Sequence, residues 1–149
     1  MTIYIAADHG GYKMKEMLKT YLLGKGERVE DMGPEAFNPA DDYPDFSLSV
    51  AQAVAQDHGS LGILLCRSGQ GVCIVANKVK GIRTTMAWNK EVAAEGRRDN
   101  HANILCLASD FLSDEEAKQI ADAWLNEKPA TEERHVRRVK KIEAIENNQ

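Results

Sequence analysis

The segment 62–78 (GILLCRSGQGVCIVANK) constrains the fold of this chain more than any other part of it. Residues 63–65 form an uninterrupted apolar run, which is typical of a strand buried on both faces of a sheet. Small residues follow at 66–71, and the pattern at 72–78 predicts a helix. A strand, a glycine-rich turn and a helix in this order favour a parallel α/β sheet.

The glycine-rich turn is a candidate anion site. The first amide groups of a helix lack intrahelical acceptors and lie at the positive end of the helix dipole. Gly69 and Gly71 let the backbone approach a ligand closely, so the turn could cradle an oxyanion. Cys66 lies where the strand enters the turn, and the helix end and Arg67 both favour its reactive thiolate form. The alternative is a plain connection in which the cysteine is a small core residue.

Composition excludes several classes of protein. The chain has 149 residues, 43% of them hydrophobic, which suits one domain spanning 1–149. A net charge of −4 argues against nucleic acid as a partner. No apolar stretch has membrane-spanning length and no signal peptide is evident, so we expect no membrane partner and a cytoplasmic location. The three cysteines show no CxxC spacing, which predicts reduced thiols and no metal site.

Strand and helix patterns alternate along the chain, which predicts a parallel sheet covered on both faces, with right-handed crossovers. The first helix should bury an apolar face made of Met14, Met17, Leu18 and Tyr21. A capping box from Ser113 to Glu116 predicts the start of a later helix. Strands are expected at 2–7, 27–32, 63–65, 82–87 and 103–107, and helices at 12–23, from 43 onward, and at 72–78, 89–97, 113–126 and 131–147.

Polar residues follow three of the predicted strands. Asp8 and His9 follow the first, the turn at 66–71 follows the third, and Trp88 follows the fourth. Because ligands of parallel sheets bind beyond the carboxyl ends of the strands, these residues predict a small-ligand pocket. The core, in contrast, is expected to include Cys73, Cys106 and Trp124.

The last predicted helix, 131–147, carries a cluster of basic residues, although the chain as a whole has a net negative charge. Arg134 and Arg138 are four residues apart and face the same way, a spacing that suits a phosphate. The alternative is a solvated helix face with internal ion pairs. The apolar stripe of this helix needs a partner surface, in the same chain or in a second subunit: Val136, Val139, Ile142 and Ile145.

Several motifs together identify a resemblance. Over nearly its whole length the chain is similar to the ribose-5-phosphate isomerase B family, which includes the galactose-6-phosphate isomerase subunits. The motifs are ADHGGYKMKE, DDYPDF, GILLCRSGQGVCIVANKVKGIR, DNHANIL and RHVRRVKKIEAIE, in this order. The resemblance implies a Rossmann-like three-layer α/β sandwich with a five-stranded parallel sheet and an extra C-terminal helix. It also implies aldose–ketose isomerisation of a sugar phosphate without metal or organic cofactor, at sites formed in the interface of a homodimer, with a tetramer as the larger alternative.

Position by position, the resemblance implies roles for individual residues. Cys66 resembles the base that moves a proton between C1 and C2 of the sugar. Ser68 matches a serine or threonine of the family, and the amides around Ser68, Gly69 and Gly71, with Asn100, resemble the site of the enediolate oxygen. The sugar hydroxyls would contact Asp8, His9 and Tyr43, and the phosphate would contact Arg134 and Arg138, with His135 nearby.

The chain departs from the family pattern in three respects. The ring-opening histidine of the family falls at Asp99, one of its phosphate-binding arginines falls at Asp110, and CRSG replaces CGTG at 66–69. Asp99 is therefore the candidate ring-opening acid and Arg67 a candidate substrate contact. Three functions stay open: a ribose-5-phosphate isomerase of the pentose phosphate pathway, an isomerase of another (for example six-carbon) sugar phosphate, and a non-catalytic sugar-phosphate-binding subunit.

Overall fold

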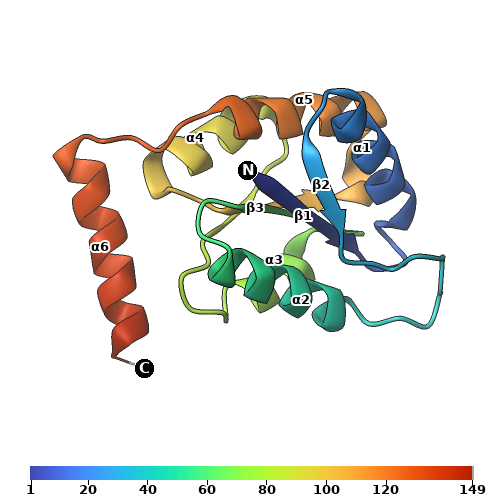
Figure 1. Cartoon of the computed structure of the whole chain (residues 1–149), viewed down its shortest axis with the longest axis horizontal. Helices are drawn as coiled ribbons and strands as arrows, with labels where there is room; N and C mark the ends of the chain where they lie inside the picture. Colours follow the sequence, from blue (N-terminus) through green and yellow to red (C-terminus); the bar gives the residue numbers. More distant parts are fainter. Residues whose placement is uncertain (149) are drawn as a thin grey trace.

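The computed structural model describes residues 1–148 and confirms the predicted parallel α/β sandwich (Figure 1). Its sheet contains five parallel strands in the order β2-β1-β3-β5-β4. The strands are β1 (Thr2–Ala7), β2 (Arg28–Asp31), β3 (Leu61–Cys66), β4 (Thr84–Met86) and β5 (Ile104–Ala108). Every residue of β3 is buried between β1 and β5, as the apolar run at its centre predicts.

Helices cover both faces of the sheet (Figure 1). One face carries α1 (Tyr12–Gly24), α4 (Lys90–Asn100) and α5 (Asp114–Asn126), and the other carries α2 (Tyr43–Gln56) and α3 (Gln70–Ala76). Because side chains alternate along a strand, Leu65 packs in the α1 and α5 core whereas Cys66 packs in the α2 and α3 core. The Cys66 thiol therefore lies on the α2–α3 side of the sheet.

Several predicted boundaries were wrong by one to three residues, including those of α3 and β4. α3 begins at Gln70 rather than at 72, because Gly69 takes a left-handed conformation, with φ of 71°, and turns the chain directly into the helix. β4 is shorter than the predicted 82–87 because it is an edge strand that pairs with β5 alone. Neither change moves the glycine-rich turn from the carboxyl end of β3.

The buried face of α1 also differs from the predicted one. Leu18 is buried as expected, but Lys15 is fully buried too, while Met17 and Tyr21 are only partly covered. The Lys15 ammonium donates to both carboxylate oxygens of Asp31 at 2.8 Å. A charge can be buried when it is paired and hydrogen-bonded, a condition that hydrophobic periodicity does not reveal.

The connections after β1 and β3 diverge. β1 continues into α1 on one face of the sheet, whereas its neighbour β3 continues into α3 on the other face. Adjacent parallel strands whose connections diverge leave a crevice at their carboxyl ends, where ligands bind. We refer to this place, between β1 and β3, as the crevice.

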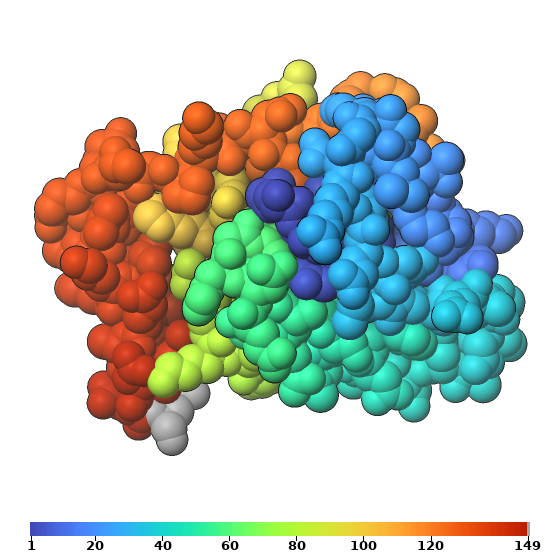
Figure 2. Space-filling model, in the orientation of Figure 1, coloured from blue at the N-terminus to red at the C-terminus, as the bar shows by residue number. Residues whose placement is uncertain are grey.

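The last helix, α6 (Glu133–Asn147), stands at the end of the molecule away from the carboxyl ends of the strands (Figures 1 and 2). It packs beside the C-terminal end of α4. Its apolar stripe is only partly covered, because Val139 is buried but Ile142 and Ile145 are exposed. One chain therefore leaves part of the stripe without a partner surface.

Candidate active site

Cys66 is the last residue of β3 and opens the glycine-rich turn. The Gly69 N–H donates a hydrogen bond to Cys66 Sγ at 3.1 Å. Because Cys66 is only 5% exposed, its sulfur meets this donor largely shielded from water. An N–H group aimed at sulfur is a good partner for a thiolate, the form in which cysteine accepts a proton.

Neighbouring elements pack directly against the turn. A β-carbon at Gly71 would lie 2.8 Å from the Tyr43 ring, so this ring, at the start of α2, covers the turn. A β-carbon at Gly10 would collide with the side chain of Arg67. The loop after β1, the start of α2 and the turn after β3 therefore meet at the crevice, as the sequence predicts.

Asp8 fastens the loop after β1. It is buried, and its carboxylate accepts a hydrogen bond from the Gly11 N–H at 3.1 Å. Its own amide donates to the Leu65 carbonyl at 3.3 Å, which ties the loop to β3. Ser68 is half-buried in the neighbouring turn.

Asp41, which was not among the predicted site residues, holds His9. One carboxylate oxygen of Asp41 accepts from His9 Nδ1 at 2.7 Å and from the His9 amide at 2.9 Å. The hydrogen bond to Asp41 raises the pKa of His9 above its ordinary 6.5; the charge of Asp8 adds to this effect, while burial and Arg67 oppose it. Asp41 therefore orients His9 and favours its charged form. In the sequence, Asp41 is the first aspartate of the DDYPDF motif, and this position is the feature that could have indicated its role.

Replacing Asp41 with asparagine is expected to lower the pKa of His9, because the anionic acceptor is lost. The pKa of His9 is higher in the folded state than in the unfolded state. The His9–Asp41 pair therefore contributes fully to stability below the unfolded-state pKa of His9, and this contribution is lost as the pH rises through the folded-state pKa. NMR titration of the His9 Cε1 proton measures the shift, with Asp42→Asn, in the exposed neighbour, as control. An unchanged His9 pKa in the Asp41→Asn variant would contradict the pairing.

Arg67 and Asp110, two residues that differ from the family pattern, face each other at the rim of the crevice. Arg67 Nη1 lies 3.8 Å from Asp110 Oδ2, and the Asp110 amide donates to the Arg67 carbonyl at 3.0 Å. Both side chains are exposed, so the ion pair contributes only about 0–1 kcal/mol to stability. Its main consequence is electrostatic, since each charge offsets the other where a substrate would enter.

The remaining predicted site residues gather at the opposite, amino-terminal edge of the sheet. Asp99 and Asn100 end α4, while Arg134, His135 and Arg138 lie on α6. Arg134 Nε donates to His135 Nε2 at 3.0 Å, and His135 Nδ1 lies 4.0 Å from the Asp99 carboxylate. His135 is buried, but Arg134 and Arg138 are exposed and free to meet a ligand.

A single chain does not unite these two groups. β5 begins four residues after Asn100 and runs parallel to β3 until Ala108 pairs with Cys66. A strand of this length spans about 16 Å, so a full strand separates Asn100 from the thiol. Figure 1 shows α6 on the same far side. We call the residues at the crevice the thiol half (Asp8, His9, Tyr43, Cys66, Arg67, Ser68, Gly69 and Gly71) and the others the arginine half (Asp99, Asn100, Arg134, His135 and Arg138).

The other cysteines lie away from the crevice. Cys106 is fully buried as predicted, and Cys73 is partly buried and packs against the core on the α2–α3 side of the sheet. Hydrogen bonds from Cys106 and Thr84 lower the pKa of Cys73 to about 6, against the effect of burial. Cys73 Sγ lies 2.7 Å from Thr84 Oγ1, at the edge strand, so this acidic thiol does not face the crevice. Within residues 1–148, no group of three or more His, Cys, Asp or Glu residues could hold a metal ion.

This arrangement suits an α/β enzyme for a small anionic substrate, with a buried thiol at one end of the sheet and arginines on a separate helix. Residues 3–142 match the family described as Ribose/Galactose Isomerase. The chain therefore belongs to the ribose/galactose isomerase family and is a sugar-phosphate isomerase.

Individual relatives resemble nearly the whole chain. It is 42% identical over 144 residues to the probable ribose-5-phosphate isomerase B of Mycoplasma pneumoniae, covering 97% of this chain and 94% of the relative. It is 38% identical over 128 residues to the D-erythrulose-4-phosphate isomerase of Pectobacterium atrosepticum, covering 85% and 83%. The crystal structure of ribose-5-phosphate isomerase B from Mycoplasma genitalium with bound ribulose 5-phosphate matches with a TM-score of 0.95 at 40% identity, covering 99% and 97%.

Proposed function

We propose that the protein interconverts ribose 5-phosphate and ribulose 5-phosphate, with Cys66 as the base. The observation that carries the proposal is the hydrogen bond from the Gly69 N–H to Cys66 Sγ in the crevice. It joins a proton acceptor to a turn whose amides can stabilise an oxyanion. The ribulose 5-phosphate bound by the Mycoplasma genitalium relative supports this choice of substrate.

The reaction would proceed on the open-chain sugar. The Cys66 thiolate removes the proton from C2 of the aldose, and the electron pair moves onto the C1 carbonyl oxygen to give an enediolate. The thiol then returns the proton to C1, while the hydroxyl proton on O2 passes to O1, which gives the ketose. The amides of Ser68 and Gly71 would bind O1, and each such donor would contribute about 10²–10³-fold to the rate.

The earlier opening of the sugar ring is assigned to Asp99, as the resemblance implies. Its carboxylate accepts a hydrogen bond from Arg98 Nε at 2.9 Å. Asp99 would therefore have to release Arg98 before it could donate a proton to the ring oxygen.

A homodimer would unite the two halves of the site. In a twofold dimer the thiol half of each subunit can face the arginine half of the other, which gives two equal sites. Arg134 and Arg138 would then hold the phosphate of a substrate bound at the partner's thiol half, and Asp8, His9 and Tyr43 would contact its hydroxyls. Exposed isoleucines on α3 and α6 support such an interface, because Ile74 and Ile145 are each 61% exposed in one chain.

A different sugar phosphate is the second candidate substrate. The Arg67–Asp110 pair at the rim alters the charge that a substrate meets, and the Pectobacterium relative is an isomerase of a four-carbon sugar phosphate. A panel of ribose 5-phosphate, D-erythrulose 4-phosphate and galactose 6-phosphate tests the proposal, and we expect the highest kcat/KM with ribose 5-phosphate. A higher value with another sugar would favour the second candidate. Binding without turnover of any sugar would indicate a non-catalytic subunit.

Two findings bear on location. Within residues 1–148, none of the helices combines the length and the apolar character needed to cross a membrane. The three cysteines are unpaired, which fits a reducing compartment, and we propose the cytoplasm.

A further inference from the structure

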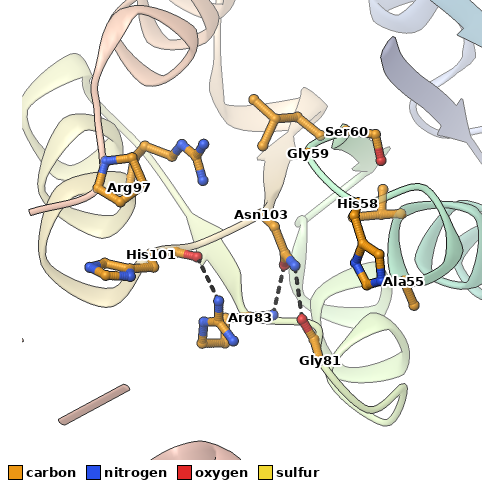
Figure 3. Close-up of a pocket in the computed structure, with 12 residues that line it drawn as sticks. Ala55, His58, Gly59, Ser60, Gly81, Arg83, Arg97, His101 and Asn103 are labelled. Carbon is orange, nitrogen blue, oxygen red and sulfur yellow. Dashed lines mark hydrogen bonds between the residues drawn. The ribbon is translucent and has the colours of Figure 1, made fainter. Parts of the chain in front are cut away.

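A cavity of about 340 Å³ opens at the amino-terminal edge of the sheet, at the far end of β3 from Cys66 (Figure 3). The starts of β3, β4 and β5 and the end of α4 contribute to it. Its volume lies in the range of small-molecule sites, about 300–1,000 Å³. Its polar lining comprises His58, Ser60, Arg83, Arg97, His101 and Asn103.

The cavity is basic. Its lining contains two arginines and two histidines but neither aspartate nor glutamate. Arg97 donates through Nη1 to the Ala102 carbonyl at 2.8 Å, but its Nε is buried and has no hydrogen-bond partner among residues 1–148. Burial and the charge of Arg83 both lower the pKa of Arg97. Because a half-buried cation without a counter-charge is costly, an anion in this cavity would be stabilised.

Ser60 adds a second unused donor. It is 5% exposed, and its hydroxyl has no partner in the described part of the chain. Asn103, in contrast, is engaged, since its side chain donates to the Gly81 carbonyl at 2.8 Å and accepts from the Arg83 amide at 2.9 Å. Figure 3 shows Arg97 and His58 on opposite sides of the cavity. The cavity thus combines positive charge with two lining residues, Ser60 and Arg97, that each keep a buried donor without a partner in the described residues.

We propose that this cavity binds a small oxyanion of the phosphate class, at a site separate from the isomerase crevice. Water in the cavity would leave the charge of Arg97 unbalanced. A phosphate supplies the counter-charge, and its oxygens match the planar fork of a guanidinium. Arg83 lines the cavity as a second cation, but it is partly engaged. Its Nη1 pairs with Glu143 at 3.9 Å, and its Nε and Nη2 donate to the Asn100 and His101 carbonyls at 3.1 and 3.2 Å.

The chain has four histidines, so one titration can monitor ligand binding at both the cavity and the candidate isomerase site. His58 and His101 line the cavity, whereas His9 and His135 belong to the two halves of the isomerase site. Inorganic phosphate is titrated into the full-length protein at constant pH and ionic strength, and the four imidazole Cε1 protons are followed by NMR. We expect saturable shifts of His58 and His101 with a dissociation constant of about 1 mM or tighter. Shifts confined to His9 and His135 would overturn the proposal.

Two substitutions test whether the shifts come from the cavity. Arg97→Gln is expected to weaken phosphate binding about tenfold or more, because a charge-assisted hydrogen bond is lost. Arg98→Gln, at the adjacent residue outside the cavity lining, is the matched control. Ala55→Glu places a carboxylate at the cavity from α2 and should also abolish the shifts, which keeps the test valid if Arg97→Gln does not fold. Unchanged shifts of His58 and His101 in the folded variants would overturn the proposal.

Discussion

The Cys66→Ala variant is expected to keep its fold and lose the isomerase reaction. A positioned base contributes about 10²–10⁴-fold to rate, so kcat should fall by that factor. KM should change little, because in the proposed mechanism the sulfur acts on the transferred proton and does not hold the sugar or phosphate. The substitution removes one buried sulfur next to the turn, and circular dichroism shows whether the fold is kept. Formation of ribulose 5-phosphate from ribose 5-phosphate measures the loss.

Cys73→Ala is the matched control for this prediction. Cys73 has the lowered pKa, about 6, and would be the base if the fraction of thiolate alone decided the role. Its thiol faces Thr84 instead of the crevice, so this variant should retain activity close to wild type. Loss of activity in Cys73→Ala together with its survival in Cys66→Ala would show that the base assignment is wrong.

The Arg138→Ala variant is expected to lower kcat/KM by about 10–100-fold, because a hydrogen bond to a charged group contributes about 1.5–3 kcal/mol. Arg138 is exposed in one chain, so the substitution should leave folding unaffected. Arg137→Ala is the control, since Arg137 lies on the same helix but pairs with Glu133. Initial rates with ribose 5-phosphate measure the effect.

A substrate without phosphate separates the role of Arg138 from a general disturbance of α6. If Arg138 binds the phosphate, wild type and Arg138→Ala should differ with ribose 5-phosphate and be alike with ribose. An equal loss of activity with both sugars would argue for a structural role of this residue.

Local patterns were sufficient to predict most of the fold. The apolar run at 63–65 identified the central strand, and the structure confirms that this strand is buried on both faces. The Ser113–Glu116 capping box begins α5 with both of its hydrogen bonds present. Trp124, predicted from its helical spacing, is fully buried. Each of these features depends on residues close together in the sequence, where spacing alone carries the information.

Long-range polar pairs could not be predicted in this way. The Lys15–Asp31 ion pair and the His9–Asp41 hydrogen bond join residues 16 and 32 positions apart. Asp41 lies in the loop at 32–42, which has no periodic pattern. Such contacts depend on how a loop closes over a sheet, and periodicity does not describe that closure.

The division of the candidate site into two halves also escaped prediction from patterns alone. Cys66 and Asn100 are both polar or reactive residues near the end of a regular element, and the sequence does not reveal that they lie at opposite edges. That separation follows from the sheet order, which places β5 beside β3 and makes the chain travel the length of β5 between them. The resemblance implied a site at a subunit interface, and the positions of the two halves make such an interface necessary for the proposed reaction.

Mixed dimers of Cys66→Ala and Arg138→Ala test the shared site most directly. Each variant alone should have little activity. In a twofold dimer that joins one subunit of each kind, the intact Cys66 faces the intact Arg138 at one of the two sites, so an equal mixture formed by co-expression should recover about a quarter of wild-type activity. Light scattering of the mixture tests whether its mass is that of a dimer. If the mixture is no more active than the separate variants, the two halves do not combine between subunits.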